Sequence, residues 1–149
     1  METLLEQMKV ILATNFSLYL KSHNYHWNIE GSNFPQYHGF LDTFYNAVWA
    51  QTDGIAEHIR MLGSYAPGSY TRFMELSDVQ EATTIPDAMT MMTILKEDND
   101  RYIIHLRAGI VAADQAGEPA ISNFLQDLLN NHILNHLHNK KHLDETYPH

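Results

Sequence analysis

Apolar residues recur at helical spacing along most of the chain, and no stretch alternates with the period of two that a half-buried strand requires. One such stripe consists of Leu4, Leu5, Met8, Ile11, Leu12, Leu18 and Tyr19. A later stripe consists of Ala88, Met92, Leu95, Tyr102, Leu106, Ile110 and Ala113. The pattern predicts an all-α protein. A length of 149 residues favours one domain, residues 1–149, with a core of its own.

Two glycines divide the helical regions into pairs. Gly31 indicates the end of a first helix, and Gly117 the end of a third. The second helix is expected over about residues 33–63, and the fourth from Glu118-Pro119 to about residue 143. Caps for the second helix are Ser32 or Asn33, with Pro35 in its first turn. Such short connections predict antiparallel neighbours.

Residues 64–85 are expected to form a long connector with a short helix around residues 70–76. Thr84 and Asp87 resemble a capping box that opens the third helix, with Pro86 in its first turn. The connectivity is therefore short, long, short. This order is typical of a ferritin-like four-helix bundle.

The chain contains no cysteine and ten histidines. The absence of cysteine excludes disulfide frameworks, thiolate zinc sites, iron–sulfur clusters and cysteine nucleophiles. Histidine without cysteine favours hard or borderline metals bound together with carboxylates. The methionines, including Met89, Met91 and Met92, are expected to fill the core.

Eighteen acidic residues against nine basic ones give a net charge of −9. Such a surface repels nucleic acid and membrane phosphates and concentrates cations. No apolar run reaches the length of a membrane span, and the acidic start Met-Glu-Thr-Leu-Leu-Glu lacks the basic region of a signal peptide. We expect a cytoplasmic protein with no membrane association.

Four potential metal ligands share one face of the second predicted helix. His38, Asp42, Asp53 and Glu57 fall at about 0°, 40°, 60° and 100° around the helix axis. A solvated polar surface would give the same pattern. However, the neighbouring Phe40, Leu41, Phe44, Tyr45, Trp49 and Ile55 are expected to be largely buried, and buried carboxylates need compensation.

Asp42 and Asp53 are too far apart to share a metal within one helix, because 11 residues span roughly 16 Å. Their positions are nevertheless symmetric about the midpoint between Ala47 and Val48, as are those of His38 and Glu57. If two copies of this helix packed antiparallel about that point, the two halves would face each other. The spacing is consistent with a metal site shared between subunits.

The segment His26-Trp27-Asn28-Ile29-Glu30-Gly31-Ser32-Asn33-Phe34, followed by His38, Asp42 and Asp53-Gly54-Ile55-Ala56-Glu57, resembles the Dps family of mini-ferritins. The resemblance is strongest over residues 18–63. It implies a dodecameric hollow shell built from two-fold dimers. It also implies iron-binding ferroxidase sites between subunits, with His26, His38 and Asp42 from one chain and Asp53 and Glu57 from its neighbour.

Several positions depart from the family pattern. His58 stands where the family usually has arginine, and His136 replaces the habitual tryptophan of the last helix. Glu118 and Asp127 match the acidic residues of the family's iron-entry pores, but Asn123 replaces the middle acid. The lysine-rich tail through which many members bind DNA is also missing.

Other residues carry alternative interpretations. His23 is either a ligand to a second iron or a surface residue, and Trp27 is either an electron relay or a packing residue. His132 and His136 have the i, i+4 spacing of a chelating pair, with His138 and His142 nearby. We favour an exposed polar helix end for them.

The resemblance implies that ferrous iron is oxidised, with hydrogen peroxide as the preferred oxidant and dioxygen as the slower one, and that the ferric mineral is stored. The Glu-x-x-His motif of bundles with an intrasubunit di-iron site is absent, which disfavours ferritin proper. Two alternatives remain: a DNA-compacting protein whose cage is mainly architectural, and an inactive scaffold of the same shape. We expect weak DNA binding or none.

Overall fold

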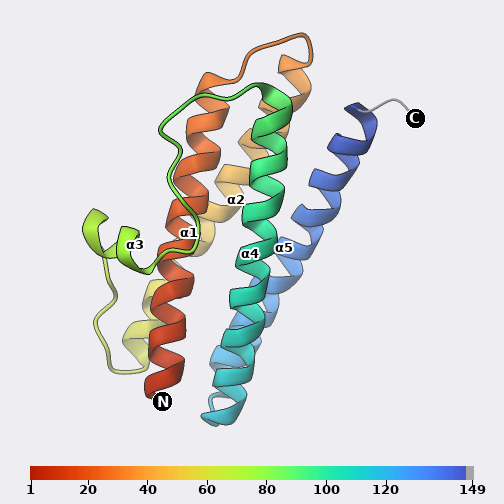
Figure 1. Ribbon diagram of the computed structural model, residues 1–149. Helices are drawn as coiled ribbons and strands as arrows, with labels where there is room; N and C mark the ends of the chain where they lie inside the picture. Colours follow the sequence, from red (N-terminus) through yellow and green to blue (C-terminus); the bar gives the residue numbers. More distant parts are fainter. Residues whose placement is uncertain (147–149) are drawn as a thin grey trace.

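The computed structural model describes the backbone of residues 1–146 and the side chains of residues 1–134. Within this part the chain forms five helices and no strand, as the hydrophobic pattern predicts (Figure 1). The helices are α1 (Glu2–Asn28), α2 (Phe34–Met61), α3 (Tyr70–Leu76), α4 (Ala88–Gln115) and α5 (Pro119–Thr146). Helix α3 is short, and the other four form the bundle.

Helices α1 and α2 are antiparallel, and so are α4 and α5 (Figure 1). The connection within each pair contains a glycine with positive φ, Gly31 at 117° and Gly117 at 70°. Such a backbone conformation disfavours residues with a Cβ atom, so these glycines permit the tight turns. Helix α1 also packs against α4, which joins the two pairs. The predicted ferritin-like arrangement of short and long connections is confirmed.

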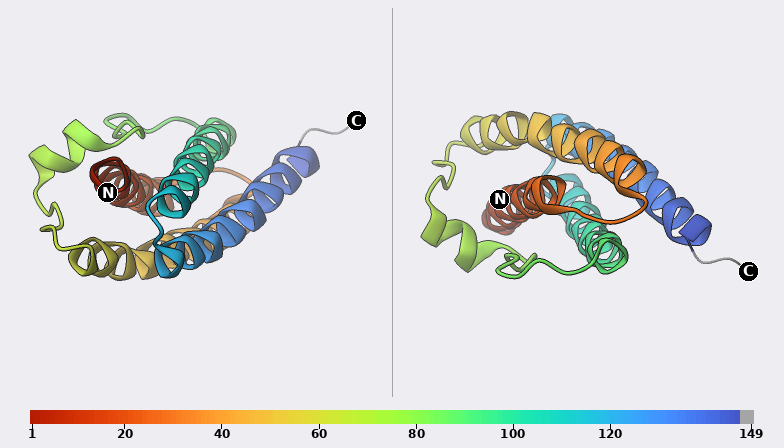
Figure 2. Two further views of the ribbon diagram at one scale, coloured as in Figure 1. Left: turned by 90° about the horizontal axis from the view of Figure 1, so that it is seen from below. Right: turned by 90° about the horizontal axis from the view of Figure 1, so that it is seen from above.

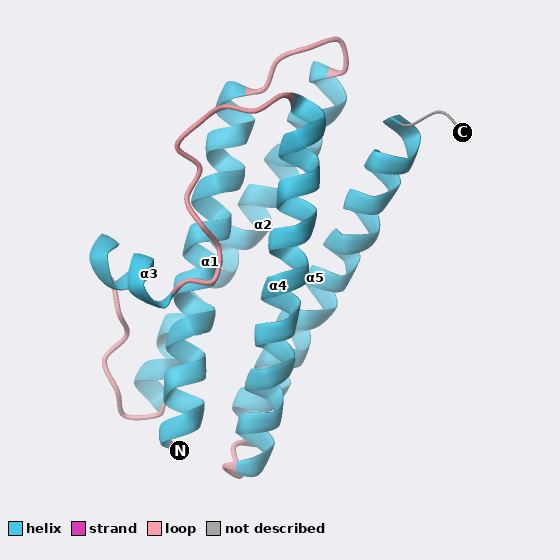
Figure 3. Cartoon of the chain, in the orientation of Figure 1, coloured by secondary structure: helices cyan, strands magenta, loops and turns pink. Residues whose placement is uncertain are grey.

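The long connector carries α3 along the outside of α1 (Figure 3). Phe73 of α3 stacks on Phe16 of α1 with the ring centroids 4.7 Å apart. Seen along the bundle axis, α3 and α5 lie on opposite sides of the molecule (Figure 2). The short helix is therefore held mainly by packing against α1.

The start of α4 differs from the prediction. The N-cap is Asp87, whose side chain accepts a hydrogen bond from the backbone N–H of Thr90 at 2.8 Å. Thr84 and Pro86 therefore lie in the connector and not in the helix. A carboxylate cap satisfies one of the free N–H groups of the first turn, and this holds the pKa of Asp87 below its usual value.

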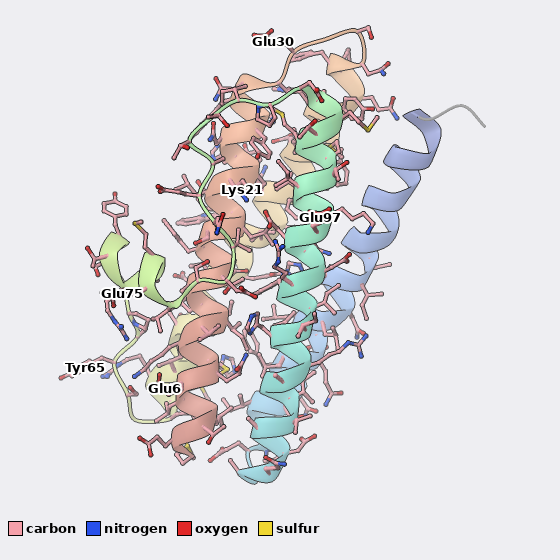
Figure 4. All side chains as sticks on the ribbon, viewed as in Figure 1. Glu6, Lys21, Glu30, Tyr65, Glu75 and Glu97 are labelled. Carbon is pink, nitrogen blue, oxygen red and sulfur yellow. The ribbon has the colours of Figure 1, made fainter. Side chains whose placement is uncertain are left out.

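The core consists of apolar side chains from all four long helices, and it includes a few buried polar contacts. Lys21 of α1 and Asp98 of α4 form an ion pair of 2.7 Å and are almost fully buried. Figure 4 places Lys21 at nearly the same level along the bundle as Glu97, the neighbour of Asp98. Among the residues described, no helix has the length and apolar character needed to cross a bilayer.

Candidate metal centre

Two histidines from different helices come together at one end of the bundle. His26 lies in the last turn of α1 and His38 in the second turn of α2. Their rings stack with centroids 3.9 Å apart. The Nδ1–H of His26 donates to the backbone carbonyl of His38 at 3.2 Å, which leaves Nε2 with a free lone pair. A histidine that ligates a metal is commonly oriented in this way.

The Nδ1 atom of His38 is buried and has no hydrogen-bond partner among the residues described. Buried polar atoms are nearly always paired, and an unpaired one requires an explanation. A buried imidazole nitrogen without a hydrogen-bond partner, beside a second imidazole, fits the donor set of a metal site. The spacing of residues in the sequence could not show that this atom lacks a hydrogen-bond partner.

Asp42 lies one helical turn beyond His38 on an exposed part of α2. Asn46 donates from Nδ2 to the Asp42 carboxylate at 3.0 Å and to its backbone carbonyl at 2.8 Å. This contact restrains Oδ1 of the Asp42 carboxylate and leaves Oδ2 available to bind a metal ion. His26, His38 and Asp42 thus form one half of the predicted ligand set, two imidazoles and one carboxylate.

Asp53 and Glu57 form the other half and do not reach the first. Both are exposed on α2 and make no hydrogen bond or ion pair within the described structure. Among the side chains described, no three histidines, aspartates or glutamates come close enough to hold a metal ion. The rise along the helix keeps the two halves apart within one chain. His26, His38 and Asp42 likewise do not come close enough in the described structure to hold a metal ion as a group of three.

An aromatic cluster surrounds the first half-site, and most of it was not predicted. The ring of His23 lies between Tyr45 at 3.8 Å and Trp27 at 4.0 Å, measured between centroids. The hydroxyl of Tyr19 lies 2.9 Å from His23 Nδ1. His23 and Trp27 do lie beside His26, in agreement with their place in the sequence. Tyr19 could have been recognised from its i, i+4 spacing to His23 on α1, whereas Tyr45 comes from α2 and has no such signal in the sequence.

Burial lowers the pKa of His23, and the neighbouring His26 lowers the pKa further, whereas the carboxylate of Asp42 acts in the opposite direction. The balance of these effects favours the neutral ring. The centroid of the His23 ring lies 6.0 Å from that of His26, so His23 faces the first half-site. Trp49, expected to be buried, is instead 52% exposed, so this side of α2 is open in the single chain.

The prediction of an exposed or chelating His132 is wrong. Its ring is completely buried, with Nδ1 2.7 Å from Asn99 Oδ1 and Nε2 2.8 Å from the side-chain amide of Gln51. Burial lowers the pKa of His132 to about 3. Both ring nitrogens are occupied by protein contacts, so none is free for a metal. The side chains of His136, His138 and His142 lie outside the described residues.

The residues matched to an iron-entry pore lie together at the start of α5. Glu118 directly precedes the helix, and Asn123 and Asp127 are exposed on its first turns. His58, at the position where arginine was expected, donates from Nδ1–H to the Gly54 carbonyl at 2.6 Å. Its ring stacks on that of Phe124 of α5, with the centroids 3.9 Å apart. It makes no ion pair in the described structure.

Comparisons with known proteins agree with this architecture. The Ferritin family, a ferritin-like domain, matches residues 5–146. Antigen TpF1 of Treponema pallidum is 33% identical over 128 residues, which cover 83% of this chain and 71% of that protein. DNA protection during starvation protein 1 of Deinococcus radiodurans is also 33% identical, over 82% of this chain and 59% of the relative.

The fold is also similar to the folds of solved structures. The crystal structure of Dps from Staphylococcus aureus superposes with a TM-score of 0.91 at 25% identity and covers 96% of both chains. Fold and sequence together define a ferritin-like protein. Within that class, the chain belongs to the Dps family.

Proposed function

We propose that this protein is an iron-binding mini-ferritin. It oxidises ferrous to ferric iron at sites shared between two subunits and stores the ferric mineral in a hollow cage, a cytoplasmic dodecamer built from two-fold dimers. The observation that carries the proposal is the division of the ligand set. His26 and His38 stack on each other and Asp42 lies one helical turn beyond His38, whereas the carboxylates Asp53 and Glu57 of α2 make no hydrogen bond or ion pair among the described residues.

The donor chemistry suits iron in both oxidation states. Imidazole nitrogens bind borderline metals such as ferrous iron, and carboxylates favour harder ions. Because ferric iron carries one more positive charge, the carboxylates Asp42, Asp53 and Glu57 stabilise it more than they stabilise ferrous iron. The ligand set therefore favours the oxidised product.

An antiparallel dimer of α2 completes the ligand set. The midpoint between Ala47 and Val48 is half-buried or buried in the single chain, and the neighbouring Trp49 is exposed. A two-fold axis at this point would bring Asp53 and Glu57 of one subunit to His26 and His38 of the other, and the same operation would form a second, identical site. The exposed aromatic surface around Trp49 would then be covered.

Hydrogen peroxide is the proposed oxidant, with dioxygen as the slower one. Two ferrous ions each lose one electron, and these two electrons reduce one peroxide molecule to two hydroxide ions. No hydroxyl radical is released when both electrons arrive together. Detoxification of peroxide and storage of iron are then one reaction. Glu118, Asn123 and Asp127 are proposed to line the route by which iron enters the cage.

The test is an anaerobic titration of the assembled protein with ferrous iron, followed by addition of peroxide and optical detection of the ferric product. We expect rapid oxidation in the wild type. The double variant Asp53→Ala/Glu57→Ala should lower the rate by more than about tenfold, since even groups that only orient metal ligands have effects of that size. The matched control is Glu6→Ala/Asp114→Ala, which removes two exposed carboxylates from other helices.

Light scattering of both double variants should show the same large assembly as the wild type. Normal oxidation by the Asp53→Ala/Glu57→Ala cage would place the active centre elsewhere. An equal loss in the control variant would show that overall negative charge, and not the proposed ligands, governs the reaction.

A further inference from the structure

We propose that a polar groove between α1, α4 and the connector that precedes α4 binds a small organic monocarboxylate. The groove has a volume of about 680 Å³. Its buried part consists of Lys21 and Tyr25 of α1 and Asp98 of α4, and Arg101 of α4 lines it beside them. A binding site of this kind goes beyond the function proposed above and does not depend on iron.

The groove lies on the side of the bundle away from α2. The connector crosses α1 and α4 (Figure 1), and in both end-on views it lies on the opposite side of the molecule from α2 (Figure 2). An antiparallel dimer along α2 would therefore leave the groove open. None of the proposed metal ligands lines it.

The hydroxyl of Tyr25 is a hydrogen-bond donor without a partner. The residue is only 2% exposed, and its hydroxyl makes no hydrogen bond among the described residues. Among the same residues, His38 Nδ1 is the one unpaired side-chain polar atom that is completely buried, so the Tyr25 hydroxyl keeps some access to solvent. Tyr25 lines this groove. Because a buried phenol usually has a hydrogen-bond partner, the hydroxyl is available to a ligand bound there.

The charged groups beside Tyr25 carry one positive charge in excess. Lys21 Nζ donates to Asp98 Oδ2 at 2.7 Å, and Arg101 Nη1 donates to Asp98 Oδ1 at 3.1 Å. One carboxylate thus faces two cations, and both of its oxygens are engaged. The Lys21 ammonium has three N–H donors and uses one of them among the described residues. A bound carboxylate would balance the charge and accept hydrogen bonds from Lys21 and Tyr25.

The outer part of the groove limits the charge and the shape of the ligand. Glu81 and Glu97 line it and are exposed, so they repel a second negative charge on the ligand. Solvent screens these exposed carboxylates more than it screens the buried charges, which favours a single carboxylate over a cation. Pro86 and Ile94 are half-buried and provide apolar surface for a short carbon chain.

The experiment measures the binding of butyrate to the intact, iron-free assembly by isothermal titration calorimetry. We expect saturable binding of one butyrate per chain. Tyr25→Phe keeps the ring and removes the hydroxyl, and it should weaken binding by about tenfold or more, because a hydrogen bond to a charged acceptor is a strong one. Tyr65→Phe is the matched control, on an 83% exposed tyrosine that does not line the groove, and should bind butyrate as the wild type does.

A second pair of variants tests the excess positive charge. Arg101→Gln removes a charge at a half-exposed position and should weaken butyrate binding several-fold. Arg107→Gln removes an exposed charge from the same helix outside the groove and should leave the affinity unchanged.

Two further probes test the class of ligand. Butylammonium has the same carbon chain with the opposite charge, and inorganic phosphate carries more negative charge, so both should bind several-fold more weakly than butyrate. Tighter binding of either probe would overturn the proposal. Absence of butyrate binding, or equal binding by the wild type, Tyr25→Phe and Arg101→Gln, would overturn it as well. These measurements need no iron, so the proposed function is unaffected by their outcome.

Discussion

His132 is a neutral imidazole in the middle of the bundle. Asn99 donates from Nδ2 to the His132 carbonyl at 2.8 Å, which fixes its amide so that the oxygen faces His132 Nδ1. A neutral ring therefore donates from Nδ1–H to Asn99, and its Nε2 accepts from the side-chain amide of Gln51, whose oxygen and nitrogen exchange places on a flip of the amide. With a folded-state pKa of about 3 against 6.5 for the free side chain, the unfolded chain binds a proton at mildly acidic pH and the folded chain does not.

This difference predicts how stability depends on pH. The contribution of His132 is complete above pH 6.5 and decreases as the pH falls toward 3, by at most about 1.4 kcal/mol per pH unit. Denaturant unfolding of the wild type and of His132→Gln, at several pH values from 7.5 to about 4, measures it. The two free energies of unfolding should converge as the pH falls. Parallel curves would contradict the neutral buried ring.

The buried pair of Lys21 and Asp98 predicts an asymmetry between two single substitutions. Asp98 also accepts from Arg101 at 3.1 Å, and Arg101 is half exposed. Lys21→Met leaves Asp98 with this second partner. Asp98→Leu leaves the buried Lys21 ammonium without a carboxylate, which costs about 3–5 kcal/mol. Unfolding by denaturant should show Asp98→Leu as the less stable variant, and the reverse order would refute this description of the pair.

At the residue scale, the sequence predicted contacts between near neighbours and missed those between distant ones. His26 and His38 could be predicted to meet, because a five-residue turn returns the chain on itself. The environment of His132 could not, since Asn99 and Gln51 lie 33 and 81 residues away in the chain. An i, i+4 histidine pair has the same sequence pattern whether the ring is exposed or buried.

At the scale of helices, substitution of two glycines that lie inside regular helices is expected to change stability in opposite directions. A Cβ atom at Gly39 of α2 would meet no other atom within 4 Å. A Cβ atom at Gly109 of α4 would lie 2.8 Å from Ile11 Cδ1 and 3.0 Å from Leu125 Cδ1, where three helices meet in the core. The terminal methyl groups of Ile11 and Leu125, both fully buried, would therefore have to move to make room for a side chain at position 109.

We expect Gly39→Ala to stabilise the fold by about 0.5–1 kcal/mol, because alanine favours the helix. Gly109→Ala should destabilise it by about 1 kcal/mol or more, because crowding in a packed core outweighs the same gain. Denaturant unfolding of both variants beside the wild type measures the difference. A stabilising Gly109→Ala would show that the helices can separate without cost.

The ends of the helices could be predicted where a glycine marks them. Gly31 and Gly117 both adopt the positive φ that their positions suggested. The start of α4 could not be placed as well, because Thr84, Asp87 and Pro86 all favour helix starts within four residues. The structure selects Asp87, since its carboxylate reaches the N–H of Thr90. Local propensity identifies candidates, and the geometry of the connector decides between them.

At the scale of the whole molecule, the charge of −9 predicts poor binding of DNA. Affinity for duplex DNA depends largely on lysine and arginine that neutralise phosphates, and a cage of such subunits multiplies the negative charge. A gel-shift assay at moderate salt with a chelator present should show no complex. A shift under these metal-free conditions would favour the DNA-compacting alternative. Binding that needs added divalent metal would instead reflect bridging between like charges.

The symmetry of the ligand positions connects the sequence of one chain to the proposed site between subunits. His38 and Glu57, like Asp42 and Asp53, lie at equal distances from the centre of α2, and the fold keeps the two halves apart. One chain therefore contains half of each proposed site. The contacts between subunits that would join the halves are not determined by the helical pattern of a single chain.

The most direct test of the shared site mixes two inactive variants. One carries His26→Ala and His38→Ala, and the other carries Asp53→Ala and Glu57→Ala, so each homogeneous cage lacks one half of every site. In a mixed dimer, one site receives both intact halves and the other receives both damaged ones. Random mixing makes about half of the dimers mixed and restores roughly a quarter of all sites.

The measurement is the rate of ferrous oxidation by peroxide in coexpressed cages that carry different affinity tags, purified through both tags to prove mixed assembly. A shared site predicts recovery to roughly a quarter of the wild-type rate when the variants mix randomly. If the ligands converged within one chain, no mixture could rebuild a site. Mixed cages that recover no oxidation would contradict the shared metal centre.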